Sequence, residues 1–415
     1  MNAAILVDTR VPARSGRREA LRCHALRRHL ALQAVGQSAD ATALVTIAAV
    51  LVLRTTQWHS VAELVMGLLL AVMPAVLSLP LAWRIADTEC RVRRLSTVHA
   101  VRAVIAAAAA VVLVVPNRTL GLAICGVMAA AQAVTGSLRA AALPSTVPPS
   151  RIAAASSLAV LTGKASGVLG IGLAASTGFV AVWIPFVVAA SLHVAASVGY
   201  ARWRHEHGDR SSGERPVAAP PSLVSSPQVL MVVGLRGITG AATMLFAVLA
   251  DRRLGLGDRG YALAIGASSA GMLLGAFLGP VWYRHRGTSP VAHLLPAAAV
   301  LTVLLGSVVS GVTTSALVIV GLAAVSAAAR LEADAVVLRE VEDRRGRSFA
   351  VYDASFQVAF VAGACLAATN PAPPRLTFQL LALGLALLLA ASWHMSSRAT
   401  KQVTGSAGHP QQRST

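Results

Sequence analysis

The chain has 415 residues, of which 55% are hydrophobic and 13% are charged, whereas soluble domains carry about 25% charged residues. This deficit of charge excludes an ordinary water-soluble protein of this length. The formal net charge is +19, but the basic residues lie between apolar runs and do not alternate with aromatic residues, so we expect no nucleic acid partner. Runs of about 20 apolar residues can cross about 30 Å of hydrocarbon. The composition therefore predicts an all-α, multi-pass protein of the lipid bilayer.

The N-terminal half begins with a basic segment, residues 1–29, which contains seven arginines and has no apolar run followed by a cleavage site. We interpret it as a cytoplasmic tail and not as a signal peptide. Six apolar segments follow and predict an N-terminal six-helix bundle over 30–200. The expected spans are 30–53, 61–83, 97–115, 119–143, 152–174 and 177–200.

A polar stretch at 201–227 separates this bundle from the rest of the chain. It contains four arginines and the pair Pro220–Pro221, which favour a central cytoplasmic loop. A C-terminal six-helix bundle is expected over 228–395, and a polar tail occupies 396–415. The expected spans of this bundle are 228–250, 260–282, 291–311, 314–337, 348–368 and 375–394.

The charge of the loops predicts an orientation. Arginines gather in the loops that would share a side with the N-terminal tail, and the opposite loops are poor in them, with an exception at 251–259. Basic loops are retained on the cytoplasmic side, so we expect both termini in the cytoplasm and the protein in the cell membrane. Residues 79–84 and 279–284 also form a weak repeat, which is typical of transporters built from repeated halves.

Four segments carry a resemblance to a known family: Gln37–Asp40, Pro80–Asp87 with its following arginines, Ala142–Pro148 and Arg339–Arg347. In these segments the chain resembles the major facilitator superfamily, in particular the bacterial branch of drug:proton antiporters and siderophore exporters. It departs from that pattern at Trp83, where glycine is expected, and at Ile171, where the antiporter signature has Gly-Pro.

The resemblance implies a major facilitator fold with 12 transmembrane helices in two six-helix bundles, acting by alternating access. It also implies a gating loop that involves Asp87, Arg91 and Arg139. In this interpretation Asp87 sits against the start of the eleventh span when the cytoplasmic side is closed, and a helix N-terminus favours such a carboxylate. The alternative is a solvated acid in an exposed loop.

Charged residues within the spans are candidates for function, because a charge in hydrocarbon costs about 2.5–3.5 kcal/mol on insertion scales. Asp40 and Lys164 both lie near mid-depth. Asp40 is expected to carry a coupling proton, or alternatively to be the structural partner of a buried cation. Lys164 is expected to pair with Asp40 or to contact an anionic substrate.

The second half contributes Arg236 from the seventh span and Arg330, Glu332 and Asp334 from the tenth. Arg330 and Asp334 are four residues apart and can pair on one helix face, which is an alternative to a cavity role. Arg236 is expected to pair with one of these acids or to contact substrate. Arg102 and Arg139 lie near predicted cytoplasmic ends, where long cationic side chains can reach the membrane surface.

Together these features predict a secondary active transporter for proton-coupled efflux of a small amphipathic or apolar molecule. No nucleotide-binding fingerprint or metal-ligand spacing is present, and we expect a monomer without cofactor or enzymatic activity, whose partners are the bilayer, the substrate and protons. Two alternatives are an importer of a polar or anionic molecule, with Lys164 and Arg236 as ligands, and a non-transporting membrane assembly partner.

Overall fold

The computed structural model describes most of the chain in continuous stretches. These are residues 13–53, 78–86, 90–112, 118–148, 151–178, 180–207, 227–255, 258–286, 312–340 and 345–369, with isolated positions between 69 and 77, at 298 and 301, and between 376 and 390. The regular elements in these stretches are all helices. They are α1 (Ala13–Ala20), α2 (His24–Leu53), α4 (Leu79–Ala86), α5 (Arg91–Val112), α6 (Arg118–Ala142), η1 (Leu143–Thr146), α7 (Ile152–Gly178), α8 (Ile184–His207), α9 (Pro227–Leu254), α10 (Asp258–Arg286), α12 (Val312–Glu340) and α13 (Arg345–Thr369).

The helices form where long apolar runs must satisfy their own backbone groups. In hydrocarbon no water can bond a free N–H or C=O, so a helix closes these bonds within the segment. Seven of the described helices are long and apolar enough to cross a membrane. Pro185 and Pro227 stand within the first two residues of α8 and α9, where the missing N–H interrupts no helical hydrogen bond.

The predicted spans coincide with helices wherever the structure describes them. Eight spans correspond to α5 to α10, α12 and α13, and the span at 30–53 corresponds to α2, which begins earlier at His24. Only the end of the span at 61–83 falls in a described helix, α4, and the spans at 291–311 and 375–394 lie outside the continuous described stretches. Several helices continue past their apolar runs. The apolar run gives the length that can lie in hydrocarbon, whereas the helix itself can extend into the polar region on either side.

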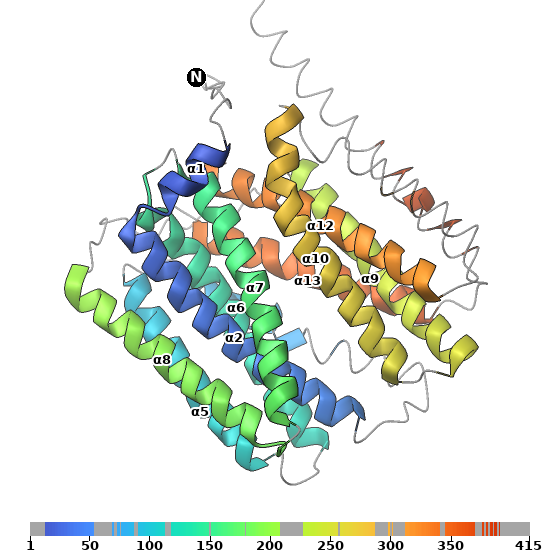
Figure 1. The fold of residues 1–415 in the computed structure, drawn as a ribbon, viewed down its shortest axis with the longest axis horizontal. Coiled ribbons are helices and arrows are strands. Elements are labelled where there is room, and N and C mark those ends of the chain that lie inside the picture. The colour runs from blue at the N-terminus through green and yellow to red at the C-terminus, as the bar shows by residue number, and fades with distance from the viewer. Residues whose placement is uncertain are drawn as a thin grey trace, which may run out of the picture.

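The helices lie in two groups (Figure 1): α1, α2 and α4 to α8 occupy one side of the molecule and α9, α10 and α12 the other, while α13 reaches from the second group to α4 and α6. Within the first group α2 packs along α7 and α5 along α8; within the second, α9 packs along α13 and α10 along α12. The first and fifth predicted spans thus pair as the seventh and eleventh do. The two halves thus form two helical bundles with matching helix pairs.

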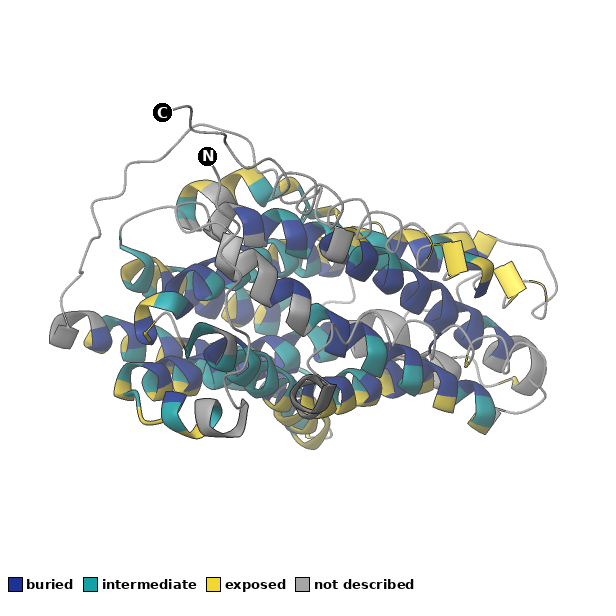
Figure 2. Ribbon diagram, turned by 90° about the horizontal axis from the view of Figure 1, so that it is seen from above, coloured by how far each residue is buried: buried dark blue, intermediate teal, exposed yellow. Residues whose placement is uncertain are grey.

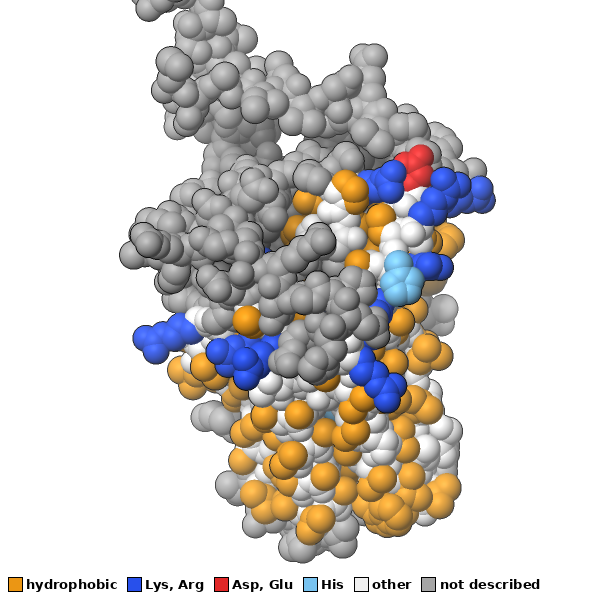
Figure 3. Space-filling view, turned by 90° about the vertical axis from the view of Figure 1, so that its left-hand side faces the viewer, with side chains coloured by type: hydrophobic (Ala, Val, Ile, Leu, Met, Phe, Trp, Pro, Cys, Tyr) orange, Lys and Arg blue, Asp and Glu red, His pale blue; other side chains and the backbone are white. Residues whose placement is uncertain are grey.

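The outer surface is apolar in the way that a lipid-facing surface requires. Val104, Leu169 and Leu366 are more than 60% exposed, and buried residues line the inner faces of the helices in both halves (Figure 2). Figure 3 shows hydrophobic side chains over the lower part of one face, with Lys and Arg gathered toward the end that carries α1. A broad exposed apolar surface of this kind marks contact with membrane.

The two halves meet at the end of the molecule that carries α1. Ala82 of α4, Val134 of α6 and Ala350 of α13 belong to one buried cluster. Ile152, at the start of α7, packs against the buried cluster of α9, α12 and α13. Small apolar side chains therefore close this end of the interface between the bundles.

Glycines allow α9 and α13 to approach one another closely. A methyl group added at Gly240 would overlap the carbonyl oxygen of Phe360, and one added at Gly363 would overlap the carbonyl oxygen of Gly237. Small residues at such crossings let helix backbones pack against each other in a membrane. The α9–α13 pair therefore depends on the absence of side chains at these two positions.

We expect Gly240→Ala to destabilise the protein, because the added methyl must push α13 away; overpacking typically costs about 1–3 kcal/mol. Gly167→Ala on α7 is the matched control, since its methyl would meet no described atom within 4 Å and alanine is the better helix former by up to about 1 kcal/mol. Thermal unfolding of both purified variants in detergent measures the difference. Equal melting temperatures would contradict the close packing of α9 and α13.

Candidate functional site

The first polar centre surrounds Asp40 on α2. Its carboxylate forms an ion pair with Arg102 of α5, and the two side chains are 4% and 1% exposed. His193 of α8 places Nε2 at 3.3 Å from Oδ1 of Asp40. Three helices of the first half thus converge on one buried carboxylate, and we call Asp40, His99, Arg102, Thr135 and His193 the Asp40 network.

A pair of histidines extends this network. The Nδ1 atoms of His99 and His193 are 3.2 Å apart, so one of them donates and the other accepts. Nε2 of His193 faces the Asp40 carboxylate without forming a hydrogen bond to it. Arg102 also donates to the hydroxyl of Thr135 on α6 at 3.0 Å. The contacts therefore link an acid, a guanidinium and two imidazoles in one chain.

Aromatic rings continue this chain toward the α1 end of the bundle. The ring of Tyr200 stacks on that of His99 with centroids 5.6 Å apart, and His29 packs against Tyr200 and Trp203. His29 is fully buried, and neither its ring nitrogens nor the Tyr200 hydroxyl has a hydrogen-bond partner among the described residues. Buried polar atoms of this kind are costly and point to a functional role or to water.

Two expectations for this region are wrong. Asp40 does not pair with Lys164, because α2 turns Asp40 toward α5 and α8 while Lys164 contacts the opposite half. Arg102 and Arg139 do not reach the membrane surface; both are buried, Arg102 because its counterion lies inside the bundle. The sequence reasoning also missed His99 and His193, although His99 stands one helical turn before Arg102.

Three hydrogen bonds join α2, which carries Asp40, to α7, which carries Lys164. Gln33 donates to the carbonyl of Ala159 at 2.8 Å. One and two turns further along α2, Ser38 and Thr42 donate to backbone carbonyls of α7, each at 3.1 Å. The two helices are therefore tied along the length that contains both charged residues.

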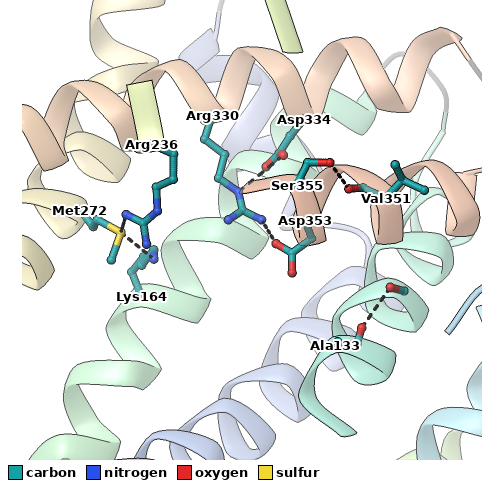
Figure 4. Close-up of polar contacts among 10 residues, drawn as sticks. Ala133, Lys164, Arg236, Met272, Arg330, Asp334, Val351, Asp353 and Ser355 are labelled. Atoms are coloured by element: carbon teal, nitrogen blue, oxygen red, sulfur yellow. Dashed lines mark hydrogen bonds and ion pairs between the residues drawn. The ribbon is translucent and has the colours of Figure 1, made fainter. Parts of the chain in front are cut away.

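The second polar centre lies between the two halves and is drawn in Figure 4. Lys164 of α7 places Nζ at 3.5 Å from the sulfur of Met272 on α10. Arg236 of α9 donates to the same sulfur at 3.4 Å. Lys164 is half-buried and Arg236 is 7% exposed, so two cations from opposite halves meet at a thioether.

Arg330 of α12 lies beside them with its own acids. It donates to Asp353 of α13 at 2.6 Å and has Nε at 3.8 Å from Asp334, one turn along its own helix. The predicted pairing of Arg330 with Asp334 is therefore confirmed. Asp353 was missed, although an acid within an apolar span is a strong signal of function. We call Lys164, Arg236, Met272, Arg330, Asp334 and Asp353 the interface cluster.

Charge is unevenly compensated within the interface cluster. Arg330 contacts both aspartates, and among the described residues neither Lys164 nor Arg236 forms an ion pair. The prediction that Arg236 pairs with an acid of the tenth span is thus not met by Asp334; Arg236 instead lies over the rings of Phe356 and Phe360. Because both nitrogens contact the same sulfur, the two like charges lie close together and repel one another.

The remaining predicted residues are placed as follows. Arg91 donates to the backbone carbonyl of Ala141 at 3.2 Å, which joins the start of α5 to the end of α6. Arg139 is buried and close enough to Asp40 and Arg102 for its charge to act on both. Asp87 lies outside the described residues, and so does the side chain of Glu332, whose backbone belongs to α12. The gating role of Asp87 therefore stays a prediction.

Neither centre has the composition of a metal site. Within the described part of the chain no group of three His, Cys, Asp or Glu side chains could hold a metal ion. In the Asp40 network the guanidinium of Arg102 occupies the position beside the carboxylate.

Solved structures with a similar fold are membrane transporters. A bacterial homologue of the iron transporter ferroportin, in an outward-facing state, matches with a TM-score of 0.68 at 15% identity over 90% of this chain and 100% of that one. The human organic anion transporter MFSD10 matches with a TM-score of 0.65 at 15% identity over 88% and 99%. FucP, a major facilitator superfamily transporter in the outward conformation, gives 0.58 at 14% identity over 90% and 98%.

These likenesses extend over nearly the whole of this chain and of each transporter, and they establish the major facilitator fold. No protein-family model matches the sequence, and no curated protein matches it. The chain is a multi-pass helical membrane protein of this fold, and its activity has to be argued from its own residues.

We expect Asp40→Asn to lower the free energy of unfolding by about 3–5 kcal/mol, because it leaves the buried Arg102 without a counterion. The double variant Asp40→Asn/Arg102→Met removes both charges and should recover most of this loss. Thermal unfolding in detergent compares the two. A single variant as stable as the wild type, or a double variant no better than the single, would contradict the buried ion pair.

Proposed function

We propose that this chain is a secondary active transporter that works by alternating access. The observation that supports this most directly is the interface cluster, where charged side chains from both halves meet at mid-span between two bundles. Transporters with repeated halves bind substrate in this position and rock the halves around it. The similar solved structures, all transporters, agree with this assignment.

We further propose that the described conformation is outward-facing. The loop charges favour a cytoplasmic location for the α1 end, with both termini in the cytoplasm and the protein in the cell membrane. The halves pack together at that end through Ala82, Val134 and Ala350. Opening of this contact would expose the interface cluster to the cytoplasm in the other half of the cycle.

Asp40 is the proposed site of proton coupling. A buried carboxylate between a guanidinium and an imidazole is held in a given protonation state by that geometry, and a change of geometry changes its affinity for a proton. When Asp40 accepts a proton, its charge attraction to Arg102 is lost and the carboxyl group that His193 faces becomes neutral. Proton binding is thereby linked to the positions of α2, α5 and α8.

Export is the proposed direction, and it rests on the resemblance of Gln37–Asp40 and the gating segments to the bacterial exporter branch. The proposed substrate is a small amphipathic molecule. Import of an anionic molecule is the second candidate, because Lys164 and Arg236 meet at one sulfur and neither forms an ion pair with an acid that the structure describes. The structural neighbour MFSD10 is described as an organic anion transporter, so organic anions belong in any test panel.

Transport is tested with the purified protein in proteoliposomes under an imposed pH gradient. A panel of amphipathic cations, neutral compounds and organic anions is screened for flux that requires both the gradient and the protein. Whole cells that express the protein then give the direction, as secretion or as accumulation. A lack of gradient-dependent flux for the whole panel, together with co-purification of another membrane protein, would instead favour an assembly partner.

We expect Asp40→Asn to abolish gradient-driven flux of a substrate found in this screen while membrane insertion is kept. The double variant Asp40→Asn/Arg102→Met separates coupling from stability, because it removes the uncompensated charge but still lacks the acid. It should regain thermal stability without regaining gradient-driven flux, and Asp40→Glu should retain flux. Gradient-driven transport by the double variant at wild-type rate would assign Asp40 a structural role alone.

A further inference from the structure

We propose that Lys164 and Arg236 together bind the anionic group of a small amphipathic anion, such as an aromatic carboxylate. This inference rests on the proposed transport function for the claim that the anion is carried across the membrane. The binding itself stands on the geometry of the interface cluster alone.

The two cations point toward one place from opposite halves. Nζ of Lys164 and the guanidinium of Arg236 both lie within 3.5 Å of the Met272 sulfur, and Figure 4 shows them directed toward each other. A thioether is a weak acceptor and carries no charge. A carboxylate that entered here would replace the sulfur as the shared partner and accept charge-assisted hydrogen bonds from both sides.

Arg236 supplies an independent sign of a missing partner. Its side chain is more than nine-tenths buried, and its Nε has no hydrogen-bond acceptor among the described residues. A buried guanidinium usually pairs with a carboxylate through two nitrogens. The neighbouring Arg330 donates to Asp353 and lies 3.8 Å from Asp334, so both described acids of the cluster contact Arg330 and neither forms an ion pair with Arg236.

The surroundings of Arg236 also fit an apolar body on the ligand. The guanidinium carbon lies 4.8 Å from the ring centroid of Phe356 and 4.3 Å from that of Phe360. An aromatic or aliphatic group could pack beside the ring of Phe360, which is only partly buried, while its carboxylate lies between the cations. The site thus favours an amphipathic anion over a bare inorganic one, because the apolar part adds contact area that sulfate lacks.

The positions of the two cations suggest how binding joins the halves. Lys164 belongs to α7 of the first half and Arg236 to α9 of the second, so a shared anion draws the two bundles together and cancels their repulsion. This site is separate from Asp40, whose partners are Arg102 and His193. Anion and proton therefore occupy different places in the protein.

The test measures binding to the purified full chain in detergent. The probe is 2-naphthoate, with uncharged 2-naphthamide as its matched analogue and sulfate as the bare anion. We expect naphthoate to raise the melting temperature in a concentration-dependent way, with sulfate weaker and naphthamide without effect. The proposal would be overturned if naphthamide stabilised the protein as much as naphthoate does. It would also be overturned if none of the three compounds stabilised the protein.

Variants locate the site. Lys164→Met should weaken naphthoate binding at least tenfold and should raise the melting temperature of the ligand-free protein, because it removes one of two repelling cations. Lys164→Arg should keep binding, and Arg202→Gln, at an exposed position of α8, is the surface-charge control. Wild-type affinity for naphthoate in Lys164→Met would overturn the assignment, whatever the melting temperature of the ligand-free variant.

Anionic lipid headgroups offer the same charge, so the binding is repeated in nanodiscs of phosphatidylcholine with and without phosphatidylglycerol. Unchanged naphthoate affinity supports a soluble ligand, and displacement by phosphatidylglycerol would overturn that part of the proposal.

Failure of the transport function is recognised separately. Lys164-dependent binding without flux would disprove transport alone, and gradient-driven flux of uncharged compounds without anion binding would disprove this inference alone.

Discussion

The need to neutralise charge inside hydrocarbon governs both polar centres of this protein. In the first half the carboxylate of Asp40 meets the guanidinium of Arg102, and beside them His99 and His193 form a hydrogen bond that needs no net charge. At the interface between the halves three cations meet two described acids, and both acids contact Arg330. The first centre therefore holds its acid against a counterion, with the buried Arg139 nearby, whereas in the second Lys164 and Arg236 have no acid among the described residues as partner.

The fold was largely predictable from the sequence because hydrocarbon imposes length and hydropathy directly on each span. Span positions and the pairing of Arg330 with Asp334 follow from periodicity along one helix. The partner of Asp40 did not follow, because it depends on which face of α2 meets α5 and α8. Depth alone made Lys164 look like the nearest cation, yet α7 directs it to the other half.

The residues missed by the sequence reasoning share one property: the contact that makes each of them important is with a residue on another helix. His193 stands alone in its apolar span and looks like a satisfied core residue until Asp40 and His99 are placed beside it. Asp353 acquires its role from Arg330. The glycines of α9 and α13 behave likewise, since their importance lies in the backbone of the facing helix.

The separation of the two centres determines how protons and substrate can be linked. Asp40 and Lys164 do not touch, so their coupling has to pass through the helices that carry them. Those helices, α2 and α7, are joined by hydrogen bonds from Gln33, Ser38 and Thr42 on either side of Asp40. If protonation of Asp40 releases Arg102, the force that holds α2 against α5 weakens while its bonds to α7 remain. A shift of α2 would then carry α7 with it and move Lys164 relative to Arg236, which changes the affinity for an anion held between them. Coupling of this kind requires two arrangements of one rigid helix pair, and no proton or substrate has to pass between the two centres.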